Sequence, residues 1–214
     1  MKFAFFAAFL IIANLAMAAN FQDYDPDTIV VTDVIPLVNI PLAFKSNFPT
    51  DYLENLHCTK AVTNSECESI KDSIRSYSSH NFPRTCEGKI TKEDWATVLY
   101  WQLYFESKFN KYGSPGTSSA KGICQFIDGT AREYKLYDRH NNKECVRAQT
   151  EYMEYIANLP HINCKVSLTV AAYHDGQNAE NIKNGVITRG TEGYKYTLVN
   201  IMPKVRQTTG REYT

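Results

Sequence analysis

Residues 94–107 read DWATVLYWQLYFES, and this stretch decides the fold of the chain. At 3.6 residues per turn it predicts a helix with Glu106 roughly 20° from Trp95 on one face, together with Leu99, Gln102 and Phe109. A carboxyl on an apolar helix face is costly to ionise, because desolvation disfavours the charged form. Acid catalysis is one reason to keep such a group. A carboxyl with a raised pKa holds its proton near neutral pH and can deliver it to a leaving oxygen.

Residues 1–18 are predicted to be a signal peptide. Lys2 supplies a basic start, residues 3–16 form a short apolar run, and Ala16-Met17-Ala18 supplies a small-residue cleavage site. The run is short for a bilayer span, so no stable membrane insertion is expected after cleavage. The mature chain is expected to be periplasmic or secreted.

Six cysteines follow the predicted cleavage site, and an even number in an exported chain predicts up to three disulfides whose pairing stays open. They are Cys58, Cys67, Cys86, Cys124, Cys145 and Cys164. A zinc site is disfavoured, because the chain has no C-x-x-C pair and its five histidines are scattered. No metal or cofactor is expected.

The mature chain is expected to form one mainly α domain behind an N-terminal extension. Residues 19–84 are assigned to the extension, which reads as extended up to about residue 49 and as helical in pieces over 51–77, with a loop over 76–86. Residues 85–214 are assigned to the main domain. Further helices are expected from about residue 130 and over about 146–158, 165–173 and 194–208.

The charge composition argues against a nucleic-acid partner. Lys plus Arg and Asp plus Glu both number 23, so the formal net charge is zero. Nucleic-acid binding domains usually carry a marked basic excess, which this chain lacks.

Four short motifs follow one another in a specific order. Their sequences are Glu106-Ser107-x-Phe109-Asn110, then Gly122-Ile123-Cys124-Gln125 with Thr130-Ala131 downstream, then Ala171-Ala172-Tyr173-His174-Asp175-Gly176, and last Glu192 with Tyr196. A spacing of four places Glu192 and Tyr196 on one face if both are helical. The order resembles the soluble lytic transglycosylase (SLT) family, whose pattern is E-S-x-F-N, G-L-M-Q with T-A, A-Y-N-A-G and E-T-x-x-Y. The resemblance covers about residues 93–205.

The resemblance implies a lysozyme-like domain of the goose-type lysozyme/SLT kind, classed as α+β, that acts on peptidoglycan glycan strands as a monomer. It implies cleavage of the MurNAc-β-1,4-GlcNAc bond with Glu106 as the single catalytic residue, first as acid and then as base toward the muramic acid 6-hydroxyl. The product would carry a 1,6-anhydro end. By the same resemblance, the substrate-binding residues would be Ser107, Gln125, Tyr173, His174, Glu192 and Tyr196.

Three departures from the family pattern fall in its second and third motifs at positions that bear on the site. His174 stands in the Asn position, Asp175 in the Ala position and Cys124 in the Met position. The Asn and Met positions lie near the sugar in relatives, so one hypothesis is an altered preference for modified or deacetylated glycan. His174 as a hydrogen-bonded structural residue is the alternative. Cys124 is expected in a disulfide.

Two other functions stay open at this stage. A true lysozyme would need a second carboxylate, since ordinary glycosidases pair two carboxyls about 5 to 9.5 Å apart. The candidates are Asp128, which otherwise reads as a helix cap, Asp175, which otherwise reads as a turn residue, and Glu192. The other alternative is a non-catalytic glycan-binding or secretion-assembly protein.

Overall fold

The computed structural model describes residues 51–113 and 118–213. The predicted signal peptide and the extended stretch before residue 50 lie outside these ranges. The elements are η1 (Tyr52–Asn55), α1 (Asn64–His80), η2 (Arg84–Cys86), α2 (Lys92–Ser107), α3 (Asp128–Glu133), α4 (Asn142–Ala157), α5 (Val166–Asp175), α6 (Glu180–Lys183), α7 (Glu192–Tyr194), the π-helical η3 (Lys195–Ile201) and α8 (Met202–Thr209).

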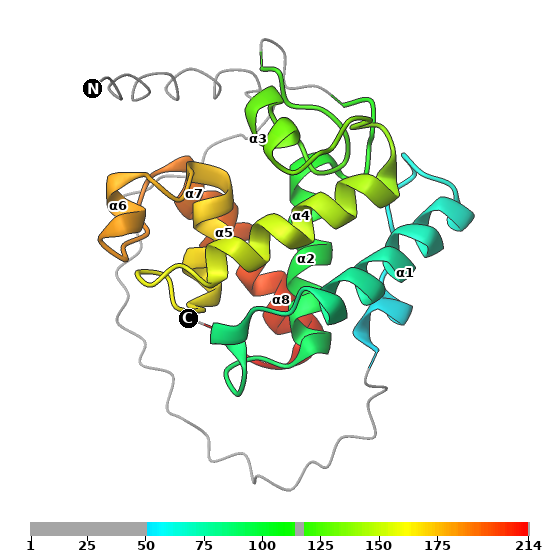
Figure 1. Cartoon of the computed structure of the whole chain (residues 1–214). Helices are drawn as coiled ribbons and strands as arrows, with labels where there is room; N and C mark the ends of the chain where they lie inside the picture. Colours follow the sequence, from blue (N-terminus) through cyan, green and yellow to red (C-terminus); the bar gives the residue numbers. More distant parts are fainter. Residues whose placement is uncertain (1–50, 114–117, 214) are drawn as a thin grey trace, which may run out of the picture. The chain divides into compact units, whose positions relative to one another are not determined.

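The fold is mainly α, as predicted. Over the described ranges the only β pairing is a single bridge between Lys121 and Phe126. Figure 1 shows α2 in the middle of the molecule, with α1 and α4 crossing it and α8 beneath. No helix within 51–113 or 118–213 has the length and hydropathy needed to cross a membrane.

Helix α2 is the core of the domain. It begins after Thr91, whose side-chain oxygen accepts a hydrogen bond from the Asp94 amide at 3.1 Å, as expected of an N-cap. The sequence predicts one apolar face, yet residues 94–100 are all buried in succession, because other elements cover the helix on nearly every side. The helix is exposed at Lys92 and Glu93 in its first turn and becomes partly exposed again toward its C-terminal end, where Glu106 lies.

The backbone after α2 turns sharply. Lys108 and Phe109 both adopt left-handed conformations, with φ of 53° and 62°. This conformation costs a non-glycine residue roughly 1 to 2 kcal/mol. The fully buried Phe109 ring packs on Tyr100 at 5.1 Å between centroids, and the Lys108 carbonyl accepts a hydrogen bond from the Thr59 hydroxyl. These contacts hold the turn that follows Glu106.

Helix α1 belongs to the same compact unit as α2. It starts with a capping box between Thr63 and Glu66. It packs on α2 and α4, and Ile70 and Ile74, one turn apart, are buried. The loop predicted from residue 76 begins only after His80, because the buried Ser78 keeps the chain helical. The unit extends from Thr50 to Thr214, so the boundary expected between residues 84 and 85 lies within it.

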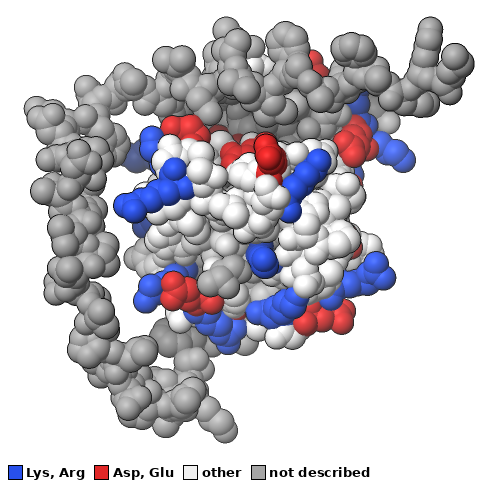
Figure 2. All heavy atoms as spheres, turned by 90° about the vertical axis from the view of Figure 1, so that its left-hand side faces the viewer, with Lys and Arg blue, Asp and Glu red and all other residues white. Residues whose placement is uncertain are grey.

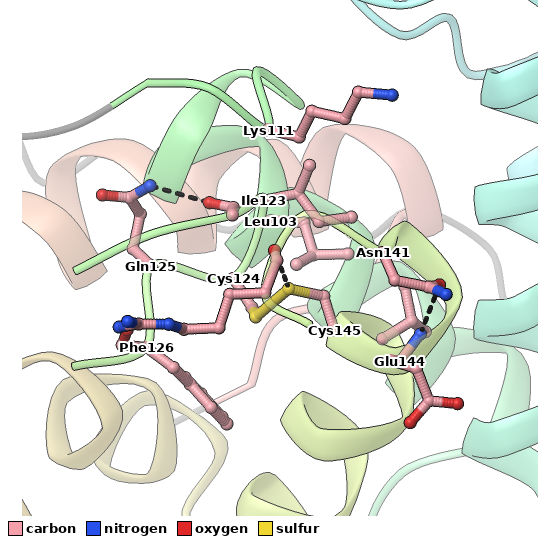
Figure 3. Close-up of a disulfide and its surroundings, with 12 residues drawn as sticks. Leu103, Lys111, Ile123, Cys124, Gln125, Phe126, Asn141, Glu144 and Cys145 are labelled. Atoms are coloured by element: carbon pink, nitrogen blue, oxygen red, sulfur yellow. Dashed lines mark hydrogen bonds between the residues drawn. A yellow bond between two sulfur atoms is a disulfide. The ribbon is translucent and has the colours of Figure 1, made fainter. Parts of the chain in front are cut away.

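All six cysteines are paired, which confirms the prediction of three disulfides. The pairs are Cys58–Cys67, Cys86–Cys164 and Cys124–Cys145. The Cys124–Cys145 disulfide links the loop before Gln125 to the first turn of α4 (Figure 3). Gly122 is needed beside it, because its φ is +75° and an added Cβ would lie 1.8 Å from the Arg139 carbonyl oxygen.

The C-terminal tail closes on the first turn of α2. Asp94 is fully buried, and one of its carboxylate oxygens accepts hydrogen bonds from Arg211 at 2.6 Å and from the Tyr213 hydroxyl. A buried carboxylate needs such partners, because an unpaired buried charge is strongly destabilising. The tail therefore contributes to the stability of the helix that carries Glu106.

We predict that Arg211→Met lowers the free energy of unfolding by about 2 kcal/mol, because it leaves the buried Asp94 with one partner fewer while solvent screens part of the effect. Arg206→Met is the matched control. Arg206 pairs with Glu212 at 3.8 Å and both side chains are exposed, so its loss should cost less than about 0.5 kcal/mol. Urea unfolding of both variants measures the difference, and equal midpoints would contradict the prediction.

Candidate active site

Glu106 lies in the last turn of α2 and is partly buried. Its Oε1 accepts a hydrogen bond of 2.5 Å from the Tyr196 hydroxyl. Burial raises the pKa of Glu106 to about 7, against the hydrogen bond from Tyr196 and the charge of His174, which both lower it. The carboxyl is therefore about half protonated at neutral pH, as the sequence predicts for a catalytic acid.

Tyr196 reaches Glu106 from the π-helical segment η3. Single π-helical turns are rare and often occur at functional sites, and here the segment connects α7 to α8. Tyr196 is 8% exposed, and burial together with the Glu106 charge raises its pKa well above the usual value. The phenol therefore keeps its proton and serves as a donor to the carboxyl.

Tyr173 approaches the same carboxyl from α5. Burial and then the charge of Glu106 raise its pKa well above the usual value, which places the two groups within electrostatic reach. Its hydroxyl donates a 2.8 Å hydrogen bond to the Cys124 carbonyl oxygen, and its ring packs against Phe126 and Tyr152. Tyr173 thus joins α5 to the loop before Gln125.

Ser107 and Gln125 hold that loop in place. The Ser107 hydroxyl donates to the Ile123 carbonyl oxygen at 2.8 Å. Gln125, with a left-handed φ of 50°, donates from Nε2 to the carbonyl oxygens of Gly122 at 2.7 Å and Gly113 at 3.1 Å. The donors of both side chains bind backbone carbonyl oxygens, while the Gln125 Oε1 has no hydrogen-bond partner among residues 51–113 and 118–213.

His174 adjoins Tyr196 and Asp175. Its ring stacks on the Tyr196 ring at 4.6 Å between centroids, and its Nδ1 lies 2.8 Å from Asp175 Oδ1. The structure therefore brings His174, Tyr173, Tyr196 and Glu106 into one cluster. Glu192, in contrast, has a 51% exposed side chain that pairs with Lys195 at 3.2 Å, so it does not share the buried face of Tyr196.

None of the three candidate second carboxylates hydrogen-bonds to Glu106. Asp128 is not the predicted helix cap: it is already the first residue of α3 and pairs with Arg139 at 2.7 Å. Asp175 is the last residue of α5. It contacts His174, whose ring stacks on the Tyr196 ring, and Tyr196 in turn donates a hydrogen bond to Glu106.

Other polar residues near the site were not predicted. Gln149 on α4 donates from its Nε2 to Gln102 Oε1 at 2.9 Å and to the Leu99 carbonyl oxygen at 3.2 Å, and both glutamines are fully buried. Gln102 lies one turn before Glu106 on the same helix. A glutamine on the face that carries the acid is the one feature of the sequence that could have indicated this pair.

The surroundings of the cluster contain neither a metal site nor a one-sided charge. No group of three or more His, Cys, Asp or Glu within 51–113 and 118–213 is placed to hold a metal ion. Figure 2 shows side chains of both charges spread over the visible face. A hollow of about 290 Å³ lies instead beside Cys58 and Cys67, and Glu106 is not among its lining residues.

Comparison with known proteins agrees with this geometry. A search of curated proteins found no match. Residues 87–192, which run from just before α2 to the start of α7, match the family model of the transglycosylase SLT domain. The matched region contains Glu106 and the Tyr173–His174 segment, and the fold is helical and lysozyme-like. Through residues 87–192, the chain therefore belongs to the transglycosylase SLT domain family.

Proposed function

We propose that this protein is an exported enzyme that cuts the β-1,4 bond between N-acetylmuramic acid and N-acetylglucosamine in peptidoglycan. The SLT domain supports a peptidoglycan-cleaving function of the lytic transglycosylase type. The observation that carries the proposal is the partly buried Glu106, whose pKa lies near 7 and whose Oε1 is held by Tyr196. A carboxyl in this state can lose and regain a proton during one reaction cycle.

In the proposed mechanism Glu106 acts twice. Because Oε1 already accepts the Tyr196 hydrogen bond, Oε2 is the oxygen that carries the proton and gives it to the glycosidic oxygen. The resulting carboxylate is stabilised by Tyr196 and by the charge of His174, which both lower its pKa. It then accepts the proton of the muramic acid 6-hydroxyl as that oxygen attacks C1, which gives a 1,6-anhydro end.

The remaining motif residues are proposed to support the substrate around Glu106. Ser107 and Tyr173 fix the carbonyl groups of Ile123 and Cys124, and Gln125 presents its free Oε1 beside them. Glu192 lies at the exposed edge. A rigid loop of this kind fits the need to hold a polymer in one register.

Export is part of the proposal and rests on the disulfides together with the predicted signal peptide at residues 1–18. Three disulfides are typical of the periplasm or the extracellular space, because cytosolic thiols are kept reduced. The site of action would then be the cell wall, and the partner would be the peptidoglycan glycan strand.

We predict that Glu106→Gln lowers the rate of peptidoglycan lysis at least about 100-fold, because the amide cannot donate a proton to the glycosidic oxygen. Glu93→Gln is the matched control, since Glu93 is an exposed glutamate in the first turn of the same helix. Turbidity of purified peptidoglycan measures both variants. Retention of more than about a tenth of the activity in Glu106→Gln would refute the assignment of the acid.

The masses of the released fragments identify the reaction. A lytic transglycosylase gives disaccharide products lighter by one water than the corresponding hydrolysis products, because the 6-hydroxyl replaces water as nucleophile. We expect the lighter products to dominate in mass spectra of a complete digest. Fragments at the full hydrolysed mass would indicate a lysozyme instead, with water entering beside Glu106.

Lysis is expected to decline as the pH rises through about 7, because Glu106 then loses the proton that it must donate. The alkaline limb of kcat/KM on soluble glycan strands measures this midpoint. An alkaline midpoint near pH 4.5, the ordinary pKa of glutamate, would contradict a pKa of Glu106 that burial raises.

The pH dependence of folding stability reports the pKa of Glu106 without any substrate. The folded pKa of about 7 lies above the ordinary 4.5, so the stability that protonated Glu106 contributes is present below pH 4.5 and lost as pH rises through 7. Between pH 4.5 and 7 the free energy of unfolding of Glu106→Gln should therefore rise relative to that of the wild type, by about 2 to 3 kcal/mol near pH 7. Glu93→Gln should show no such gain.

A further inference from the structure

His174 and Asp175 form a largely buried pair. The His174 side chain is 26% exposed and that of Asp175 19%, and His174 Nδ1 lies 2.8 Å from Asp175 Oδ1. A carboxylate can only accept, so Nδ1 carries the hydrogen and donates it. The second ring nitrogen, Nε2, is then the one that gains or loses a proton. The pair therefore holds the imidazole in one orientation and in one tautomer when it is neutral.

The pair is connected to the catalytic carboxyl through Tyr196. The His174 ring stacks on the Tyr196 ring at 4.6 Å with an angle of 32° between the planes. The Tyr196 hydroxyl donates to Glu106 Oε1 at 2.5 Å. Asp175, His174, Tyr196 and Glu106 thus form a continuous series of contacts from α5 across η3 to α2.

Gly193 makes room for this arrangement. A Cβ at position 193 would lie 2.2 Å from Asp175 Oδ2 and 2.4 Å from Oδ1, distances at which one group must move. The SLT pattern has Thr where this chain has Gly193 and Ala where it has Asp175. The added carboxylate and the lost side chain occupy the same space, so the two departures fit each other.

We propose that Asp175 and His174 are positioning residues that place a positive charge beside Glu106 and so set how readily Glu106 releases its proton. The role rests on the proposed function and deepens it, because it adds a second titrating group to a site in which the family pattern has Asn and Ala. Asp175 acts through His174, and His174 acts on Glu106 through space and through the Tyr196 ring.

The charges around His174 support this role. Four groups face it from four elements: Glu106 on α2, Asp175 on α5, Glu192 on α7 and Tyr196 on η3. Burial alone would lower the pKa of His174, but the hydrogen bond to Asp175 and the charges of the three carboxylates outweigh burial and raise it. In return, the charge of His174 opposes the rise in the pKa of Glu106. Such coupling is reciprocal, so each group must respond when the other is removed.

The first test measures the coupling without any substrate. NMR follows the His174 ring through a pH titration in wild type, Glu106→Gln and Asp175→Asn, with the signal assigned by its loss in His174→Gln. We expect both variants to move the His174 midpoint downward by about half a unit to one unit, because each removes a nearby negative charge. Asp72→Asn is the matched control, since Asp72 is an exposed aspartate of α1 that pairs with Arg75, and it should leave the midpoint unchanged.

The second test measures the effect on catalysis. His174→Gln should move the alkaline limb of lysis upward by about one pH unit, because loss of the positive charge makes Glu106 hold its proton more tightly. Gly193→Ala should move the limb in the same direction, since the added methyl displaces the Asp175 carboxylate.

The two tests separate the proposal from the proposed function. A His174 midpoint that shifts by less than about 0.2 unit in Glu106→Gln and in Asp175→Asn would overturn the coupling, whether or not the protein cuts peptidoglycan. An alkaline limb that stays in place in His174→Gln, while Glu106→Gln abolishes lysis, would overturn the positioning role and leave the catalytic assignment intact. Unchanged lysis in Glu106→Gln together with a shifted His174 midpoint would refute the proposed function but leave the electrostatic coupling of His174 intact.

Discussion

The hydrogen bond between Tyr196 and Glu106 is the interaction on which the site depends. It joins the end of α2 to η3, segments 90 residues apart in the sequence. The carboxyl is disfavoured as an anion by burial, and it also lies in the last turn of a helix, where the negative end of the helix dipole opposes a further negative charge. The hydrogen bond from Tyr196 stabilises the anion and lowers the pKa of Glu106, but the pKa remains above its ordinary value. The result is a carboxyl that is neither a permanent anion nor a permanent acid at neutral pH.

Several backbone irregularities border this carboxyl. Of the six non-glycine residues with positive φ in the described ranges, Lys108, Phe109 and Gln125 lie within the segments that border the site. Conformations of this kind persist only where surrounding contacts determine them, and they cluster at functional sites. Here the contacts are the buried Phe109 ring, the Thr59 hydrogen bond and the Cys124–Cys145 disulfide. The disulfide thus stabilises a loop whose carbonyl oxygens at Gly122, Ile123 and Cys124 accept hydrogen bonds from site residues.

The helices could be predicted from local patterns, because their causes are local. Thr91 caps α2, and Ile70 and Ile74 lie at the spacing of a buried stripe. The resemblance carried by the order of the motifs predicted that Tyr173, Glu192 and Tyr196 lie near Glu106. Tyr196 donates a hydrogen bond to Glu106, whereas the half-exposed Glu192 pairs with Lys195. The pairing of the cysteines, the Asp128–Arg139 ion pair and the fit of Gly193 to Asp175 could not be predicted. Each depends on how the folded backbone brings particular side chains together, and local composition does not encode that.

The buried glutamines behind the site determine the direction of its hydrogen bonds. Gln149 donates from Nε2 to both the Leu99 carbonyl oxygen and Gln102 Oε1, so the Gln102 amide must present its Nε2 on the other side. That nitrogen has no regular hydrogen-bond partner among the described residues, yet Gln102 is the group that opposes the rise in the pKa of Tyr196. A donor on this side of the phenol would favour Tyr196 as a donor toward Glu106 rather than an acceptor. In the proposed mechanism, the proton that Glu106 transfers is then carried on Oε2, the oxygen that Tyr196 leaves free.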